Sequence, residues 1–172
     1  MMQEKKVTVS VVMGSDSDLP VMEETVKVLK DFGIAHELVL TSAHRSPERT
    51  SSYAKKAAER GVRIIIVGAG AAAHLAGVIA SQTHLPVIGI PIDATSLRGL
   101  DALLSTVQMP GGIPVATMAI GKAGAKNAAL MAIRILSLED ALLRKKLQTY
   151  CKKMTRDVEI RQKNLNAGNP KN

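Results

Sequence analysis

The stretch that decides the fold is VTVSVVM, residues 7–13, which runs directly into the polar turn GSDSD, residues 14–18. Apolar and β-branched residues dominate the first seven positions, as is typical of a parallel strand that is covered on both faces. Short runs of the same kind recur at residues 37–40, 63–67, 87–90 and 113–118. The sequence therefore predicts about five buried strands.

Helical patterns lie between these runs. Met22, Val26 and Leu29 follow one another at spacings of four and three, and the pattern stops at Gly33. Strands that alternate with helices predict an α/β fold. We expect a three-layer αβα sandwich with a flavodoxin-like parallel sheet in the order 2-1-3-4-5, followed by a long C-terminal helix. In such sheets ligands bind beyond the carboxyl ends of the strands, so the loops that follow the strands are the place to look for a site.

Charge and composition limit the kinds of partner that the protein can be expected to bind. The net charge is +8, but residues 139–172 carry nine Lys and Arg against four Asp and Glu, so most of the excess belongs to the tail. With no Trp, one Phe and two Tyr, the chain lacks the aromatic platforms of single-strand binders, and we expect no nucleic acid. No apolar run approaches the roughly 20 residues that cross a bilayer, so we expect no membrane.

The redox chemistry of the chain suits a reducing compartment. Cys151 is the only cysteine in the sequence and cannot form an internal disulfide. Residues 1–6 lead directly towards the first strand and lack the apolar core of a signal peptide. We therefore expect a cytoplasmic protein.

The stretch TSAHRSP, residues 41–47, follows the second strand and leads into a helix. Ser46 is a good N-cap and Pro47 suits the first helical position. His44 and Arg45 then lie on a short strand-to-helix turn, where free N–H groups and the helix dipole favour an anion such as phosphate. Imidazole is also the side chain that changes its protonation most easily near neutral pH. The alternative is a surface loop with two solvated side chains.

The loop after the first strand, GSDSD, offers a similar choice. Glycine permits a tight turn, and the serines with free N–H groups suit phosphate oxygens. Asp18 could accept hydrogen bonds from the hydroxyls of a ribose. Alternatively, Ser17 or Asp18 only caps the following helix.

The loop after the third strand, GAGAAAHL at residues 68–75, matches a dinucleotide-binding fingerprint, with Asp93 at a suitable distance. That fingerprint normally follows the first strand, and the rest of the chain has no room for a separate substrate domain, so we do not expect NAD. A run of residues this small lets the backbone approach a ligand closely.

The chain organisation follows from the remaining segments. Residues 1–138 are predicted to form the flavodoxin-like domain, and residues 91–114 are long enough to form a wall of a ligand site. Residues 128–136 are apolar on nearly every side, which predicts a buried helix and contacts between subunits. Residues 139–165 are predicted to form a helix that packs on a neighbouring subunit, and residues 166–172 a frayed tail.

Four motifs in this order resemble one family. They are GSDSD at residues 14–18, SAHR at 42–45, GAG with AAHL at 68–75, and Ser105 with VQMP at 107–110. Together they resemble the bacterial N5-carboxyaminoimidazole ribonucleotide mutases of purine biosynthesis (the PurE family). The resemblance covers residues 7–137, and the third loop follows the mutase type rather than the animal-type carboxylase that uses CO2 directly.

The resemblance implies an isomerase that moves a carboxylate from an exocyclic nitrogen to ring carbon C4 of an aminoimidazole ribonucleotide, with CO2 as a transient species. It implies a homo-octamer, no cofactor and no metal. His44 matches the general acid and base. Ser15, Asp18 and Arg45 match residues that bind the ribose phosphate. The remaining matched positions line the site: Ser42, Gly70, Ala72, His74 and Leu75.

Several alternatives stay open. The protein could be a direct carboxylase that uses CO2 and aminoimidazole ribonucleotide, or a non-catalytic nucleotide-binding module. His74 could shape the site or transfer a proton itself. The chain departs from the family at Ala71, where glycine is usual, and at Ala76, where proline is usual. Alanine at 71 costs little unless that position needs a positive φ, and the loss of proline at 76 could loosen the loop.

Overall fold

The computed structural model describes residues 7–167, and both end segments, residues 1–6 and 168–172, lie outside it. Five parallel strands form one sheet in the order β2-β1-β3-β4-β5, as predicted. The strands are β1 (Val9–Met13), β2 (His36–Leu40), β3 (Ile64–Gly70), β4 (Val87–Ile92) and β5 (Ala116–Thr117). The helices are η1 (Asp16–Asp18), α1 (Leu19–Phe32), α2 (Pro47–Lys56), α3 (Leu75–Ala80), α4 (Leu100–Val107), α5 (Lys122–Leu136) and α6 (Ala141–Ala167).

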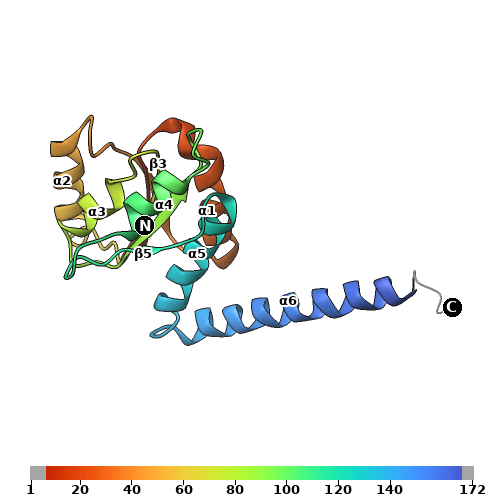
Figure 1. Cartoon of the computed structure of the whole chain (residues 1–172). Helices are drawn as coiled ribbons and strands as arrows, with labels where there is room; N and C mark the ends of the chain where they lie inside the picture. The colour runs from red at the N-terminus through yellow and green to blue at the C-terminus, as the bar shows by residue number, and fades with distance from the viewer. Residues whose placement is uncertain (1–6, 168–172) are drawn as a thin grey trace. The chain divides into compact units, whose positions relative to one another are not determined.

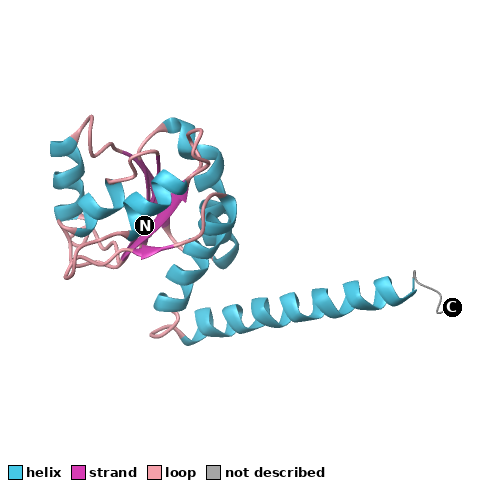
Figure 2. Ribbon diagram, in the orientation of Figure 1, coloured by secondary structure: helices cyan, strands magenta, loops and turns pink. Residues whose placement is uncertain are grey.

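Helices cover both faces of the sheet (Figures 1 and 2). On one face, residues of β3 such as Ile65 and Val67 share a buried cluster with Ala54 of α2, Ile79 of α3 and Ala102 of α4. On the other face, a Cβ added at Gly68 of β3 would lie 2.2 Å from the sulfur of Met22 in α1. The side chain of Met22 therefore packs directly against the backbone of Gly68, where α1 lies on the sheet. The expected three-layer αβα sandwich is confirmed.

The strand register aligns the carboxyl ends of four strands. Met13, the last residue of β1, lies opposite Leu40 of β2 and Gly68 of β3, and Gly70 of β3 lies opposite Ile92 of β4. The segments that follow these four strands therefore start at the same edge of the sheet. β1 and β4 are buried along their whole length, which accounts for their nearly unbroken apolar sequence.

Most of the predicted boundaries hold. The first long helix ends at Phe32 because Gly33 takes a left-handed conformation (φ 75°) and donates its N–H to the carbonyls of Leu29 and Lys30. β5 is shorter than the predicted residues 113–118, because only Ala116 and Thr117 pair with β4. Pro114 has no N–H to offer such a ladder.

The helix α5 differs from its prediction. Within residues 122–132, Ala125, Ala128, Ala129 and Ala132 are buried, whereas Lys126 and Asn127 are exposed. Thr25 of α1 donates its hydroxyl to the carbonyl of Ala125 at 2.8 Å. This part of α5 is therefore amphipathic rather than apolar on every side, and its buried face packs within the chain's own fold. The predicted contact with a neighbouring subunit stays a prediction. The octamer itself remains a prediction.

By its internal contacts the chain divides into residues 1–132 and residues 133–172. In the second unit, Arg144 of α6 donates hydrogen bonds to the carbonyls of Ser137 and Leu138, which fixes the turn between α5 and α6. α6 ends at Ala167, so the first two residues of the predicted frayed tail are helical and the last five lie outside the described residues. Packing of α6 on another subunit stays a prediction. Across residues 7–167 there is no helix with the length and apolarity to span a membrane.

A polar cluster ties α2 to the edge of the sheet. Arg60 donates two hydrogen bonds to Glu37 of β2, at 2.9 and 2.8 Å, and lies over the ring of Tyr53. Tyr53 donates its hydroxyl to Glu37 at 2.6 Å and contacts Ser10 of β1. Burial raises the pKa of Glu37, but the hydrogen bonds from Arg60 and Tyr53 outweigh it and hold that pKa below its usual value. Burial and the Glu37 carboxylate raise the pKa of Tyr53 to about 12, so its hydroxyl stays a donor.

We expect Arg60→Ala to lower the free energy of unfolding by about 1 kcal/mol at neutral pH, since the pair is partly exposed. Because the pKa of Glu37 is lowered on folding, the stabilisation is complete above the ordinary value of 4.5 and is lost as the pH falls through the folded value. Urea unfolding of both proteins from pH 7 to pH 3 measures this, with Lys55→Ala on the exposed side of α2 as the control. A difference between native and variant that is independent of pH would contradict it.

Candidate active site

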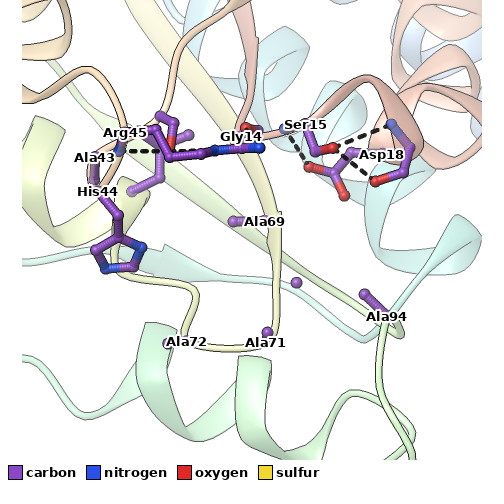
Figure 3. Close-up of a pocket in the computed structure, with 14 residues that line it drawn as sticks. Gly14, Ser15, Asp18, Ala43, His44, Arg45, Ala69, Ala71, Ala72 and Ala94 are labelled. Atoms are coloured by element: carbon purple, nitrogen blue, oxygen red, sulfur yellow. Dashed lines mark hydrogen bonds between the residues drawn. The ribbon is translucent and has the colours of Figure 1, made fainter.

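The segments after β1, β2, β3 and β4 enclose a cavity of about 370 Å³ (Figure 3). Its walls are mostly glycine, alanine and serine, with three charged or titratable side chains among them. The lining residues are Gly14, Ser15, Ser17, Asp18, Ser42, Ala43, His44, Arg45, Ala69, Gly70, Ala71, Ala72, Leu75 and Ala94. A cavity at this edge is where an open α/β sheet binds its ligand.

The segment after β1 is held by a reciprocal capping box. Ser15 is the N-cap of η1, and its hydroxyl oxygen accepts from the N–H of Ser17, while the Asp18 carboxylate accepts from the N–H of Ser15 at 3.0 Å (Figure 3). The sequence offered Ser17 or Asp18 as the cap of the following helix, but Asp18 occupies the N-cap position of α1 without a side-chain cap hydrogen bond, and the capping side chain is that of Ser15 on η1. The box fixes a hydroxyl and a carboxylate in the wall of the cavity.

Asp18 is an unusual wall residue because its side chain is only 4% exposed. Burial raises its pKa, while the N–H groups of Ser15 and Gly14 and the charge of Arg45 act in the opposite direction without cancelling it. A buried carboxylate with few donors gains from a ligand that donates hydrogen bonds to it. Sugar hydroxyls are such donors, so the contact is chemically suited to a ribose.

The segment after β2 places Arg45 against the segment after β1. Arg45 donates from its guanidinium to the carbonyl of Gly14 at 2.9 Å, and its backbone N–H donates to the hydroxyl of Ser42. One guanidinium edge thus joins two segments, and the rest of its donors remain for an anion. Ser46 occupies the N-cap position of α2, but its hydroxyl donates back to the carbonyl of Ser42, so the predicted side-chain cap is absent.

The third wall is partly strand. Gly68, Ala69 and Gly70 continue β3, so the loop proper is only residues 71–74, and Leu75 begins α3. A Cβ added at Gly70 would lie 2.5 Å from the Cβ of Ala94, so β3 and the segment after β4 approach too closely for any side chain there. Backbone therefore forms this part of the cavity wall.

Ala71 takes a left-handed conformation, with φ 52°. That position needs a positive φ, so alanine is not a neutral replacement for glycine and stores about 1 to 2 kcal/mol of strain. Ala76 behaves differently, because it is a buried residue in the first turn of α3 rather than part of the loop. The expectation that the loss of proline at this position loosens the loop stays a prediction.

His44 projects from the segment after β2 towards the loop of residues 71–74 (Figure 3). Its Nε2 lies 2.9 Å from Nδ1 of His74, and the two rings meet edge to face with their centroids 5.0 Å apart. His74 itself does not line the cavity. It lines an adjacent groove of about 430 Å³ together with Ser105, Gln108 and Met109.

Eight of the nine predicted site residues therefore meet at one cavity, and the ninth, His74, reaches it through His44. Six further residues line the cavity and were not assigned to the site from the sequence: Gly14, Ser17, Ala43, Ala69, Ala71 and Ala94. Ala94 follows the fourth strand, so the rule that ligands lie at carboxyl ends could have found it. The others are small residues, which carry no chemical signal in the sequence and are recognised as lining residues only in the folded structure.

Comparison with known proteins agrees with this geometry. The family model described as AIR carboxylase matches residues 8–157. The chain is 57% identical over 164 residues to a Pyrococcus horikoshii protein named N5-carboxyaminoimidazole ribonucleotide mutase, covering 95% of this chain and 92% of that protein. A Thermotoga maritima protein of the same name is 53% identical over 150 residues, covering 87% and 86%.

Solved structures agree as well. The crystal structure of Treponema denticola PurE superimposes with a TM-score of 0.82 at 31% identity, covering 92% of this chain and 98% of that one. The family model spans most of the chain, and two relatives exceed half identity over nearly their whole length. The chain belongs to the AIR carboxylase family.

Proposed function

We propose that this protein is an N5-carboxyaminoimidazole ribonucleotide mutase, an isomerase that forms 4-carboxy-5-aminoimidazole ribonucleotide in purine biosynthesis. The names of its relatives support the reaction. The observation that carries the proposal is His44, the imidazole in the wall of a cavity otherwise built of small residues, beside Arg45. A proton carrier, an anion-binding cation and a small enclosed space are what this reaction needs.

The chemistry follows from these groups. His44 protonates the carbamate nitrogen, the C–N bond breaks with its electron pair on nitrogen, and CO2 is released. The electron-rich C4 of aminoimidazole ribonucleotide then attacks the retained CO2 at a high effective concentration. C4 now carries both hydrogen and carboxylate, and His44 removes the hydrogen as a proton. The ring regains its aromaticity and His44 its starting state.

Binding is assigned to the other walls. Arg45 and the η1 turn with Ser15 hold the ribose phosphate through charge-assisted hydrogen bonds. Asp18 accepts from ribose hydroxyls. Ser42, Gly70, Ala72 and Leu75 surround the base and the CO2. The wall near the CO2 offers methyl groups and backbone, which limits the water available to compete for it.

An assay with purified protein tests the function. We expect the N-carboxylated substrate to give the C4 product without ATP or added bicarbonate. Efficient product formation only from aminoimidazole ribonucleotide with bicarbonate would identify a direct carboxylase. Binding of the ribonucleotide without any turnover would identify a nucleotide-binding module. Either of these results would overturn the mutase assignment.

We also propose a cytoplasmic homo-octamer. Leu97, Leu100 and Leu104 leave about half or more of their surface exposed, at 60%, 53% and 48%, and their spacing puts them along α4 and the turn before it. Exposed apolar stripes of this kind often mark contacts between proteins. Sedimentation velocity at micromolar concentration is expected to give one species of about eight chains. A stable monomer across a dilution series would contradict this prediction.

A further inference from the structure

The hydroxyl group of Ser15, in the wall of the cavity beside Asp18 (Figure 3), is fully used by hydrogen bonds within the η1 turn. It donates to Oδ1 of Asp16 at 3.1 Å. Its oxygen accepts from the N–H of Ser17 at 3.4 Å and from the hydroxyl of Ser17 at 2.8 Å. A hydroxyl has one proton and two lone pairs, so its whole bonding capacity is taken. A phosphate that accepts from Ser15 must therefore replace the carboxylate of Asp16.

The backbone N–H of Ser17 is directed at the same carboxylate. It donates to Oδ1 of Asp16 at 3.1 Å, a shorter bond than the one that it makes to Ser15. One carboxylate oxygen thus accepts from a hydroxyl and from a backbone N–H, which are both donors that bind anionic oxygens. In this conformation the chain supplies its own anion to the η1 turn.

The side chain of Asp16 has space beside the turn. Asp16 is exposed and lines a second hollow of about 340 Å³. This second hollow adjoins the cavity, because four residues line both of them: Gly14, Ser15, Ser42 and Arg45. The carboxylate can therefore leave the donors of the η1 turn without entering the cavity or the core.

The negative charge of Asp16 acts on the cavity itself. Burial is the largest cause of the raised pKa of Asp18, and the charge of Asp16 also raises that pKa. Asp18 lies in the cavity wall, next to the donors of Ser15. An anionic ligand held by Ser15 meets the same like charge.

We propose that Asp16 is a specificity-determining residue whose carboxylate competes with the substrate phosphate for the donors of Ser15 and Ser17. With no ligand bound, the carboxylate holds these donors. The phosphate takes them over when it binds, and the side chain of Asp16 turns into the second hollow. Asp16 thereby weakens binding of the ribonucleotide. The proposal rests on the function proposed above, and deepens it by naming a residue that limits the affinity for phosphate.

The first test is Asp16→Asn, which keeps the size of the side chain and an acceptor oxygen but removes the charge. We expect aminoimidazole ribonucleotide to bind roughly 3- to 10-fold more tightly, the size of effect for removing one exposed like charge close to the ligand. The matching nucleoside, which has no phosphate, should keep its affinity. In about 1 M salt the gain should fall below about twofold, since the Debye length is then only about 3 Å. Calorimetric titration measures these affinities.

The second variant is Asp16→Ala, which also removes the acceptor oxygen. It should tighten binding of the ribonucleotide at least as much as Asp16→Asn does, because the Ser15 proton is then free. In steady-state kinetics both variants should lower KM without raising kcat, since the phosphate takes no part in the bonds that change. Both variants should fold, because the side chain that they alter is exposed.

Asp93→Asn is the matched control. It removes one exposed negative charge directly after β4, at the same edge of the sheet, from a residue that lines neither the cavity nor the second hollow. It should keep native affinity for both ligands. A gain equal to that of Asp16→Asn would mean that net charge alone controls affinity, and the inference would be wrong.

Two further results would overturn the proposal. If Asp16 only holds the η1 turn in shape, its variants will change the affinities for nucleotide and nucleoside alike. If its carboxylate does not compete with the phosphate, the affinity for the nucleotide will stay at the native value. A native protein that binds neither ligand would instead overturn the proposed function, so the two failures are distinguishable.

Discussion

His44→Asn is expected to lower turnover of the N-carboxylated substrate by at least 10² to 10⁴-fold, the usual loss for a general acid–base group. The fold should survive, because the side chain of His44 is exposed and its one hydrogen bond joins another exposed ring. Affinity for the ribonucleotide should also survive, since Arg45 and the η1 turn are unchanged. Steady-state kinetics with ligand titration by calorimetry measure both quantities.

Exchange of the C4 proton of aminoimidazole ribonucleotide with solvent should fall in parallel, because it needs the same base. His36→Asn serves as the control, since His36 lies at the start of β2, at the opposite edge of the sheet. Near-normal turnover in His44→Asn would remove this residue from the mechanism. His74 would then be the next candidate for direct proton transfer.

Arg45→Ala is expected to weaken binding of the ribonucleotide product by roughly 10- to 150-fold, the value of about 1.5 to 3 kcal/mol for hydrogen bonds to a charged group. Binding of the matching nucleoside, which has no phosphate, should change by less than about threefold on the same reasoning. The difference isolates the phosphate, because both ligands occupy the same cavity. Calorimetric titration of the two ligands measures it.

Arg134→Ala, which removes an exposed arginine from α5, controls for the loss of one positive charge. Equal losses for nucleotide and nucleoside would assign Arg45 to the sugar or the base instead. A structural cost is also checked by the comparison, because the Arg45 guanidinium holds the carbonyl of Gly14, and its removal could shift the segment after β1. Such a shift would weaken the nucleoside as much as the nucleotide.

The strands were predictable because they are local patterns, and the strand order and the site edge follow from the flavodoxin-like topology expected of such an alternation. The apolar run of β1 and the alternation with helices are each contained in one short window of sequence. The cap at Ser15 was not predicted, because the sequence pointed to Ser17 or Asp18, and all three residue types are suitable caps within four positions. Only the backbone conformation decides among them. At Ser46 the cap was predicted, but its hydroxyl makes no cap hydrogen bond to α2.

The features that sequence reasoning missed depend on tertiary approach. Gly68 and Gly70 look like loop residues but belong to β3, and at Gly70 the approach of Ala94 leaves no room for a side chain. The contact between His44 and His74 joins two segments 30 residues apart. The coverage of α5 likewise depends on α1, through Thr25, and no pattern within α5 itself reports it.

The small-residue wall also limits how the site can vary through evolution. At Ala69, Ala72 and Ala94 almost every single substitution adds atoms to a space of about 370 Å³. At Gly70 any side chain would collide with Ala94 and the carbonyl of Ile92. Substitutions that exclude an inhibitor by shrinking the cavity would therefore exclude the natural ligand too. Resistance to a compound confined within this wall must arise at polar positions such as Ser17 or outside the cavity, which makes the wall a durable target for antimetabolite design.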